Sequence, residues 1–200
     1  MRAGVWGIEE SGLGTNTFTA AFYRSPQTEI YMKRISISLA ALLIAAPAFA
    51  QSVGVEAARA NWQGMASYIT KAADQMTEAD YAYKPVATVR SFGQLIGHIA
   101  GAQYMFCSMV MGDAARGEGD IEKSTTTKEG LVAALKGSNE YCAKAYAMND
   151  AQAAGMIKLF GQDRSKMHAL VMNAAHLGEH YGNIVTYMRM KGMVPPSSQQ

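Results

Sequence analysis

Four histidines are the side chains in this 200-residue chain whose type and spacing best suit chemistry: His98, His168, His176 and His180. His176 and His180 are four residues apart, which places both imidazoles on one face of a helix, one turn from each other. Such a pair can chelate one divalent ion, and His98 from a separate helix would complete a three-nitrogen site with open positions. An isolated histidine pair is more often a coincidence of core or surface composition, so the spacing alone leaves both interpretations open.

Rival metal sites are tested by the residues around the pair. The segment from His176 to His180, HLGEH, matches the inverted zinc-protease motif H-x-x-E-H, in which the glutamate is the general base. Those peptidases take a third ligand from a downstream carboxylate, and no Asp or Glu follows Glu179. The Glu-x-x-His pairs of a di-iron bundle and the Cys-x-x-Cys-His of a c-type haem are also missing. Glu179 is a candidate catalytic base, or equally a solvated surface carboxylate.

The composition excludes several other classes of protein. Lys plus Arg is 18 and Asp plus Glu is 16, a formal charge of +2, whereas an electrostatic nucleic-acid binder needs a concentrated basic face. Hydrophobic residues make up 49% of the chain and charged residues 17%, enough to bury a core. With two cysteines, the chain can hold neither a disulfide scaffold nor a four-cysteine metal site.

A secretory signal is predicted near the start of the chain. Basic residues at 33 and 34 precede an apolar run, residues 35–46, and an Ala-x-Ala cleavage site at 48–50. The apolar run is too short to span a bilayer, so we expect no stable membrane insertion after cleavage. The sequence therefore predicts a signal peptide over 32–50 and a periplasmic or secreted protein.

The predicted signal peptide separates two other parts of the chain. Residues 1–31 precede the signal, show no sustained periodicity and are interpreted as a disordered upstream extension from a misplaced gene start. Residues 51–200 form the mature chain, whose length suits one domain.

Four helices are predicted in the mature chain from apolar residues that recur every three or four positions. They cover residues 55–76, 92–111 after an N-cap at Ser91, 127–148 after a capping box of Thr126 and Glu129, and 163–191. Residues 112–126 are expected to form a loop, and 150–162 a short helix plus a turn at Gly161. The last helix is expected to stop at Gly192. With no alternation typical of strands, the predicted fold class is all-α, a four-helix bundle.

Two segments resemble the DinB-like (YfiT-like) superfamily. They are RSFGQLIGHIA, from Arg90, for its second helix, and HLGEHYGNIVTYMRMKGMVPP, from His176, for its last. The resemblance extends over residues 55–197. It implies a four-helix bundle with a three-histidine metal site, whose ligands would here be His98, His176 and His180. Zinc, nickel, manganese and iron all suit three imidazoles. Members with known activity include thiol-dependent transferases and isomerases, which use cytosolic thiols that an exported chain would lack.

The resemblance also bears on the cysteines. Cys107 and Cys142 lie at similar distances from the starts of their helices, so their thiols are at one level if helices two and three are parallel and far apart if they are antiparallel. The up-down-down-up order that the resemblance implies makes the two helices parallel. It therefore predicts a Cys107–Cys142 disulfide, which an oxidising compartment permits.

Two functions follow from this sequence. The first is a metal-dependent enzyme, of hydrolase or transferase type, acting on a small-molecule substrate that the sequence does not identify. The alternative is a non-catalytic metal- or ligand-binding bundle that serves sequestration or a stress response. Such a bundle could also be a homodimer. A cavity that reaches the metal would favour the enzyme, and a closed site would favour the binder.

Overall fold

The computed structural model describes residues 53–199, so the predicted upstream extension (1–31) and signal peptide (32–50) lie outside the described residues. Most of this part of the chain is helical, as predicted. It belongs to one compact unit. In chain order its elements are α2 (Val53–Gln75), the 3-10 turn η2 (Ala79–Ala82), α3 (Phe92–Met111), α4 (Asp120–Ser124), α5 (Lys128–Ala145), α6 (Asp150–Ala153), β1 (Met156–Leu159), β2 (Gln162–Ser165), α7 (Lys166–Met190) and η3 (Pro196–Ser198).

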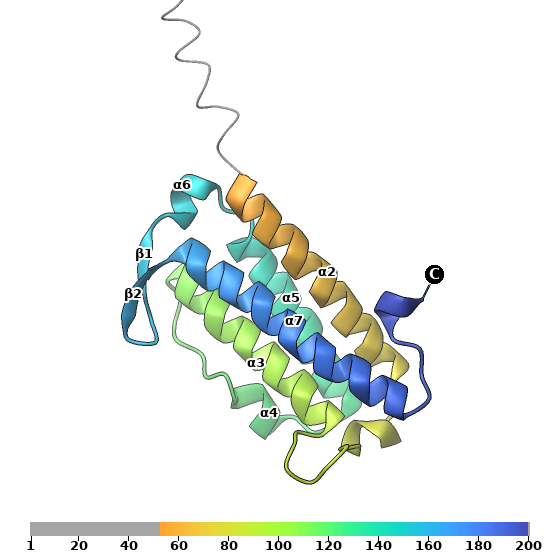
Figure 1. Cartoon of the computed structure of the whole chain (residues 1–200). Coiled ribbons are helices and arrows are strands. Elements are labelled where there is room, and N and C mark those ends of the chain that lie inside the picture. Colours follow the sequence, from red (N-terminus) through yellow and green to blue (C-terminus); the bar gives the residue numbers. More distant parts are fainter. Residues whose placement is uncertain (1–52, 200) are drawn as a thin grey trace, which may run out of the picture. The chain divides into compact units, whose positions relative to one another are not determined.

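The long helices α2 and α7 pack against each other and run in the same direction (Figure 1). Gly54, at the start of α2, lies against Met167 at the start of α7. Further along both helices, the rings of Tyr68 and Tyr181 stack with their centroids 5.3 Å apart. The apolar positions of α2 that recur every three or four residues are buried in this contact and against α5, which is why the segment folds as an amphipathic helix.

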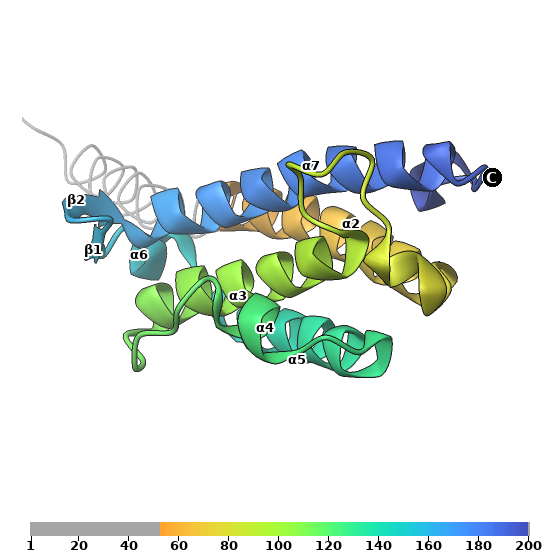
Figure 2. The same ribbon diagram turned by 90° about the horizontal axis from the view of Figure 1, so that it is seen from below.

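Helices α3 and α5 form a second parallel pair, and the short α4 lies along α3 (Figure 2). Gln103 of α3 donates from its amide nitrogen to Ser138 Oγ of α5 over 3.0 Å. The pair α3 and α7 is antiparallel, because Tyr187 near the end of α7 donates to the carbonyl of Arg90 just before α3. This antiparallel contact brings the middle of α3, which contains His98, opposite the middle of α7.

The buried side chain of Gln103 forms hydrogen bonds inside the core, where α2, α3 and α5 meet. The indole of Trp62 stacks on the ring of Tyr146 at 4.6 Å, and its Nε1 donates to Gln103 Oε1 at 2.7 Å. Gln103 and Ser138 are both fully buried, so their mutual hydrogen bond removes the cost of burying two unpaired polar side chains. This network links α3 to α2 and α5.

Cys107 of α3 and Cys142 of α5 form a disulfide, with their Cα atoms 5.4 Å apart. Both cysteines are fully buried. The bond closes a loop over a sequence separation of 35 residues, which restricts the unfolded chain.

We therefore expect the double variant C107A/C142A to lose about 3–4 kcal/mol of unfolding free energy, measured by urea denaturation. Dithiothreitol should lower the stability of the wild-type protein and leave the variant unchanged. Two free thiols in the intact mass of the non-reduced protein would contradict the pairing.

Two helix starts differ from the sequence prediction. The last helix begins at Lys166 rather than at 163, after the Ser165 side chain, which accepts a hydrogen bond from the backbone N–H of His168. The N-cap of α5 is Thr127 rather than Thr126, and its side chain accepts from Gly130 N–H. Two adjacent threonines have equal capping chemistry, so the sequence could not distinguish them.

The segment after α6 contains a β-hairpin that the sequence analysis did not predict. The short helix is present as α6, and the turn lies at Gly161 as expected, but β1 and β2 pair antiparallel on either side of it. The two turn residues, Phe160 and Gly161, have φ of 50° and 79°, the left-handed geometry that matches the twist of a two-residue hairpin. The polar strand β2, QDRS, has no alternating apolar residues, so its sequence lacks a strand signal.

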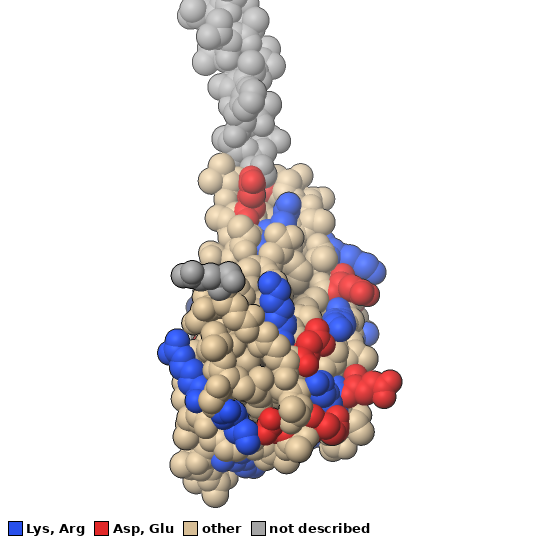
Figure 3. Space-filling model, turned by 90° about the vertical axis from the view of Figure 1, so that its right-hand side faces the viewer, with Lys and Arg blue, Asp and Glu red and all other residues tan. Residues whose placement is uncertain are grey.

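The surface of the described part is mixed in charge. On the face that Figure 3 shows, lysine and arginine side chains are interspersed with aspartate and glutamate rather than gathered in one stripe. Within residues 53–199, no helix is both long enough and apolar enough to cross a membrane.

Candidate metal centre

Helix α3, which contains His98, is capped at both ends. Helix α3 begins with a capping box, in which Ser91 accepts from the backbone N–H of Gln94 and the Gln94 side chain accepts from the backbone of Ser91. It ends at Gly112, whose φ of 77° is the left-handed conformation that suits glycine. Both ends of α3 are therefore defined by local capping residues, and His98 lies in the interior of the helix.

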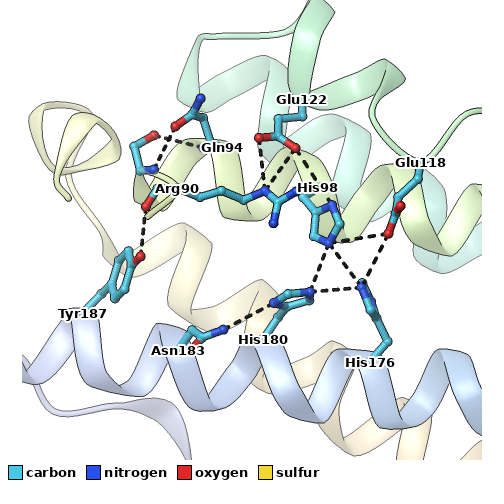
Figure 4. Close-up of polar contacts among 10 residues, drawn as sticks. Arg90, Gln94, His98, Glu118, Glu122, His176, His180, Asn183 and Tyr187 are labelled. Atoms are coloured by element: carbon cyan, nitrogen blue, oxygen red, sulfur yellow. Dashed lines mark hydrogen bonds and ion pairs between the residues drawn. The ribbon is translucent and has the colours of Figure 1, made fainter. Parts of the chain in front are cut away.

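The three predicted ligands come together at the contact of α3 with α7 (Figure 4). The Nε2 atom of His98 is 3.2 Å from Nε2 of His176 and 3.0 Å from Nε2 of His180. The Nε2 atoms of His176 and His180 are 3.0 Å apart. These three side chains are the one group of His, Cys, Asp and Glu in the described residues whose ligand atoms converge in this way.

The triangle of nitrogens fits a metal ion. Zn–N bonds of about 2.0–2.1 Å give N···N edges of about 2.9 Å in an octahedron and about 3.3 Å in a tetrahedron. The observed edges of 3.0–3.2 Å lie within that range. Without a metal, a proton on one Nε2 atom could form a hydrogen bond to only one of the other two Nε2 atoms. A cation at the centre would interact with the lone pairs of all three.

The protonation state of the imidazoles also suits a metal site. Burial, together with smaller effects of the nearby Arg90 and His180, lowers the pKa of His98 to about 4. Burial likewise lowers the pKa of His176 and of His180 to about 4, with neighbouring imidazoles acting in the same direction. All three rings are therefore neutral at pH 7, the form that binds metals.

Binding through Nε2 leaves each Nδ1 as an N–H donor that needs an acceptor. The Asn183 side-chain nitrogen lies 3.4 Å from Nδ1 of His180, and turning that amide over would present its oxygen as the acceptor. The Nδ1 atom of His98 faces Glu122 Oε2 at 3.9 Å, and Glu122 is in turn paired with Arg90 at 3.1 Å. The Nδ1 atom of His176 is buried, with no partner among the described residues.

A cavity of about 760 Å³ adjoins the histidines. Of the three histidines, His180 is the one that forms part of its wall. The other wall residues include Arg90, Gln94, Glu122, Glu179 and Tyr187. The arrangement therefore combines a three-nitrogen site with room for a small molecule beside it.

The predicted catalytic residue, Glu179, is exposed and lies in the wall of this cavity next to His180. Its carboxylate forms no ion pair with the three imidazoles within residues 53–199. The carboxylates that approach the rings are Glu118 and Glu122, which the sequence analysis did not single out. A signal for them was present in Gly97 and Gly101, whose spacing on the His98 helix predicts a close approach of another backbone.

A known protein family matches most of the described part of the chain. The model of the DinB superfamily matches residues 61–184. This chain belongs to the DinB superfamily. The predicted membership is thus confirmed, and all three histidines of the site lie inside the matched region of this DinB domain. No curated protein matches the chain.

Solved structures show the same fold. A DinB-like protein from Bacillus cereus is 19% identical, with a TM-score of 0.62, and the match covers 70% of this chain and 95% of that one. A DinB-like protein from Bacillus subtilis is 20% identical, with a TM-score of 0.55, and the match covers 70% and 97%. A mycothiol-dependent maleylpyruvate isomerase is 13% identical, with a TM-score of 0.55 and coverages of 66% and 65%.

Proposed function

We propose that this protein is an exported DinB-like domain, an up-down-down-up four-helix bundle, that binds one divalent transition metal through His98, His176 and His180. We further propose that it is a metal-dependent enzyme of hydrolase or transferase type. The observation that carries the proposal is the convergence of three neutral imidazole nitrogens, 3.0–3.2 Å apart, beside a cavity of about 760 Å³.

The cavity favours an enzyme over a closed binding site. A small substrate in it would lie against His180 on one side and against polar side chains on the others. A similar fold occurs in a mycothiol-dependent maleylpyruvate isomerase, which supports small-molecule chemistry on this scaffold. The Cys107–Cys142 disulfide supports export, because such bonds persist in oxidising compartments. The intact mass that tests the disulfide also tests whether the mature chain begins at Gln51.

The wall residues have separate roles in this proposal. A bound divalent ion would supply Lewis acidity and lower the pKa of a coordinated water. Glu179 is exposed in the cavity wall, and one of its carboxylate oxygens would accept the proton that a nucleophilic water loses. Arg90 and Glu122 form an ion pair that shapes the wall, and Tyr187 holds the Arg90 carbonyl through its hydroxyl.

An exchangeable water distinguishes the enzyme from a non-catalytic binder. We expect the Mn²⁺-loaded protein to increase the relaxation rate of bulk water protons through at least one rapidly exchanging water on the metal. The control is the same protein loaded with Zn²⁺, which is diamagnetic. Relaxation explained by outer-sphere water alone would favour the closed binder and contradict the enzyme.

A further inference from the structure

The loop before α4 brings a carboxylate to the edge of the histidine triangle. Oε1 of Glu118 is 3.6 Å from Nε2 of His98 and 3.8 Å from Nε2 of His176. In Figure 4 this carboxylate lies on the side of the rings away from Asn183 and Tyr187. We infer that Glu118 is a fourth protein ligand of the metal, so that the site is built from three imidazoles and one carboxylate. The inference rests on the proposed three-histidine site.

The backbone of this segment is held directly on α3 by two glycines that flank His98. A Cβ atom at position 101 would lie 2.0 Å from the carbonyl oxygen of Glu118. A Cβ atom at position 97 would lie 2.9 Å from Cα of Glu122. Any larger residue at Gly101 would push the Glu118 backbone away. The backbone of Glu118 is therefore held beside the three histidines by a main-chain contact with α3.

A second contact holds the turn that leads into α4. The backbone N–H of Gly117 donates to Asp120 Oδ2 over 2.8 Å, which fixes the residue immediately before Glu118. Because both the backbone contact at Gly101 and this hydrogen bond act next to Glu118, little chain freedom is left to lose when its carboxylate binds.

Charge favours Glu118 over its neighbour as the ligand. Three neutral imidazoles leave both positive charges of a divalent ion uncompensated, and one carboxylate offsets half of them. Glu122 is paired with Arg90 through both of its oxygens, at 3.1 and 3.2 Å, whereas Glu118 has no cationic side chain of Lys or Arg within ion-pair distance in the described residues. The side chain of Glu118 is 44% exposed, so it can turn toward the metal without a large desolvation cost.

This ligand set leaves coordination positions for the cavity. The cavity wall contains His180 but neither His98 nor His176, the two rings that Glu118 approaches. Glu118 would therefore bind on the side of the rings away from Asn183 and Tyr187, two residues of the cavity wall (Figure 4). A set of three nitrogens and one oxygen suits Zn²⁺, Fe²⁺ and Mn²⁺.

The test compares Zn²⁺ affinity, measured by competition with a chromophoric chelator at pH 8, in the wild-type protein, Glu118→Gln and Glu179→Gln. Glu179→Gln is the matched control, because it also removes one negative charge. Glu179 is next to His180 in the cavity wall, but its carboxylate forms no ion pair with the three imidazoles. We expect Glu118→Gln to bind Zn²⁺ about 10- to 100-fold more weakly and Glu179→Gln to change affinity less than threefold. The visible absorption of the Co²⁺-loaded protein should change for Glu118→Gln alone, since only that variant alters the ligand set.

Equal affinities for the wild-type protein and Glu118→Gln, with unchanged Co²⁺ absorption, would overturn the inference while leaving the three-histidine site intact. Absence of Zn²⁺ binding by the wild-type protein would instead contradict the proposed function itself. Circular dichroism of the metal-free variant checks that it folds, which the exposure of Glu118 leads us to expect.

Gly101→Ala provides an independent test that leaves the carboxylate in place. Its added Cβ should displace the Glu118 backbone and weaken Zn²⁺ binding by about the same factor as Glu118→Gln. The double variant should then bind no more weakly than either single variant, because both changes remove one interaction. Losses that add in full would contradict the role of Gly101 in positioning Glu118.

Discussion

His176→Ala is expected to reduce bound metal from one equivalent per chain to less than about 0.1 equivalent after desalting. His98 and His180, on different helices, would remain with the inferred ligand Glu118, and a site with two nitrogens holds a divalent ion much more weakly than one with three. Elemental analysis of the wild-type protein and the variant, each loaded with Zn²⁺ and desalted, measures the effect. Affinity should fall by more than about 100-fold.

His168→Ala is the matched control, since His168 lies on the same helix and is exposed. It should keep one equivalent of metal. The same proteins can be compared by unfolding, because a ligand at 1,000 times its Kd stabilises the folded state by about 4 kcal/mol. Zn²⁺ should raise the melting temperature of the wild-type protein and of His168→Ala but not that of His176→Ala. Equal metal content in His176→Ala and the wild type would remove the site.

The metal-free protein is expected to lose stability as the pH falls from 6.5 toward 4. The pKa of each of the three imidazoles is lowered from 6.5 to about 4 in the folded protein, mainly by burial. Well above pH 6.5 the rings are neutral in both states and contribute nothing to the pH dependence. Between pH 6.5 and 4 the unfolded chain binds protons that the folded site does not, so the unfolding free energy falls with pH.

The size of this effect follows from the pKa difference. One pKa lowered from 6.5 to about 4 corresponds to about 3 kcal/mol once the pH has reached 4, so the site should cost the metal-free protein at least that amount. Urea unfolding at several pH values, with a chelator present, measures it. The comparison is the triple variant H98Q/H176Q/H180Q, which lacks these titrating groups and should have a flatter profile. Parallel profiles for the two proteins would contradict burial of three neutral imidazoles.

Helix positions and the group of three histidines could be predicted from the sequence because most of their signals are local. The apolar period of α2, the N-cap at Ser91 and the four-residue spacing of His176 and His180 all act within one or two helical turns. The start of α7 was misplaced because the polar residues 162–165 form β2, and the pairing of β2 with β1 depends on residues across the hairpin. Strand pairing of this kind leaves little trace in a four-residue polar segment.

The carboxylates near the site were missed for a different reason. The sequence of residues 112–126 is charged and rich in glycine, which predicted a loop, and its apolar residues show no helical periodicity. What places Glu118 beside His98 is a main-chain contact with Gly101, which has no side chain that could mark the position of its partner. The glycines were visible in the sequence, but the segment that fills the space above them could not be deduced from spacing alone.

Anomalous diffraction from crystals of the Zn²⁺-loaded protein tests the central claim most directly. Data collected on both sides of the zinc absorption edge should give one peak per chain, about 2.0–2.1 Å from Nε2 of His98, His176 and His180. A metal peak bound elsewhere on the protein, or a His98 ring turned away from the other two in the loaded crystal, would contradict the account.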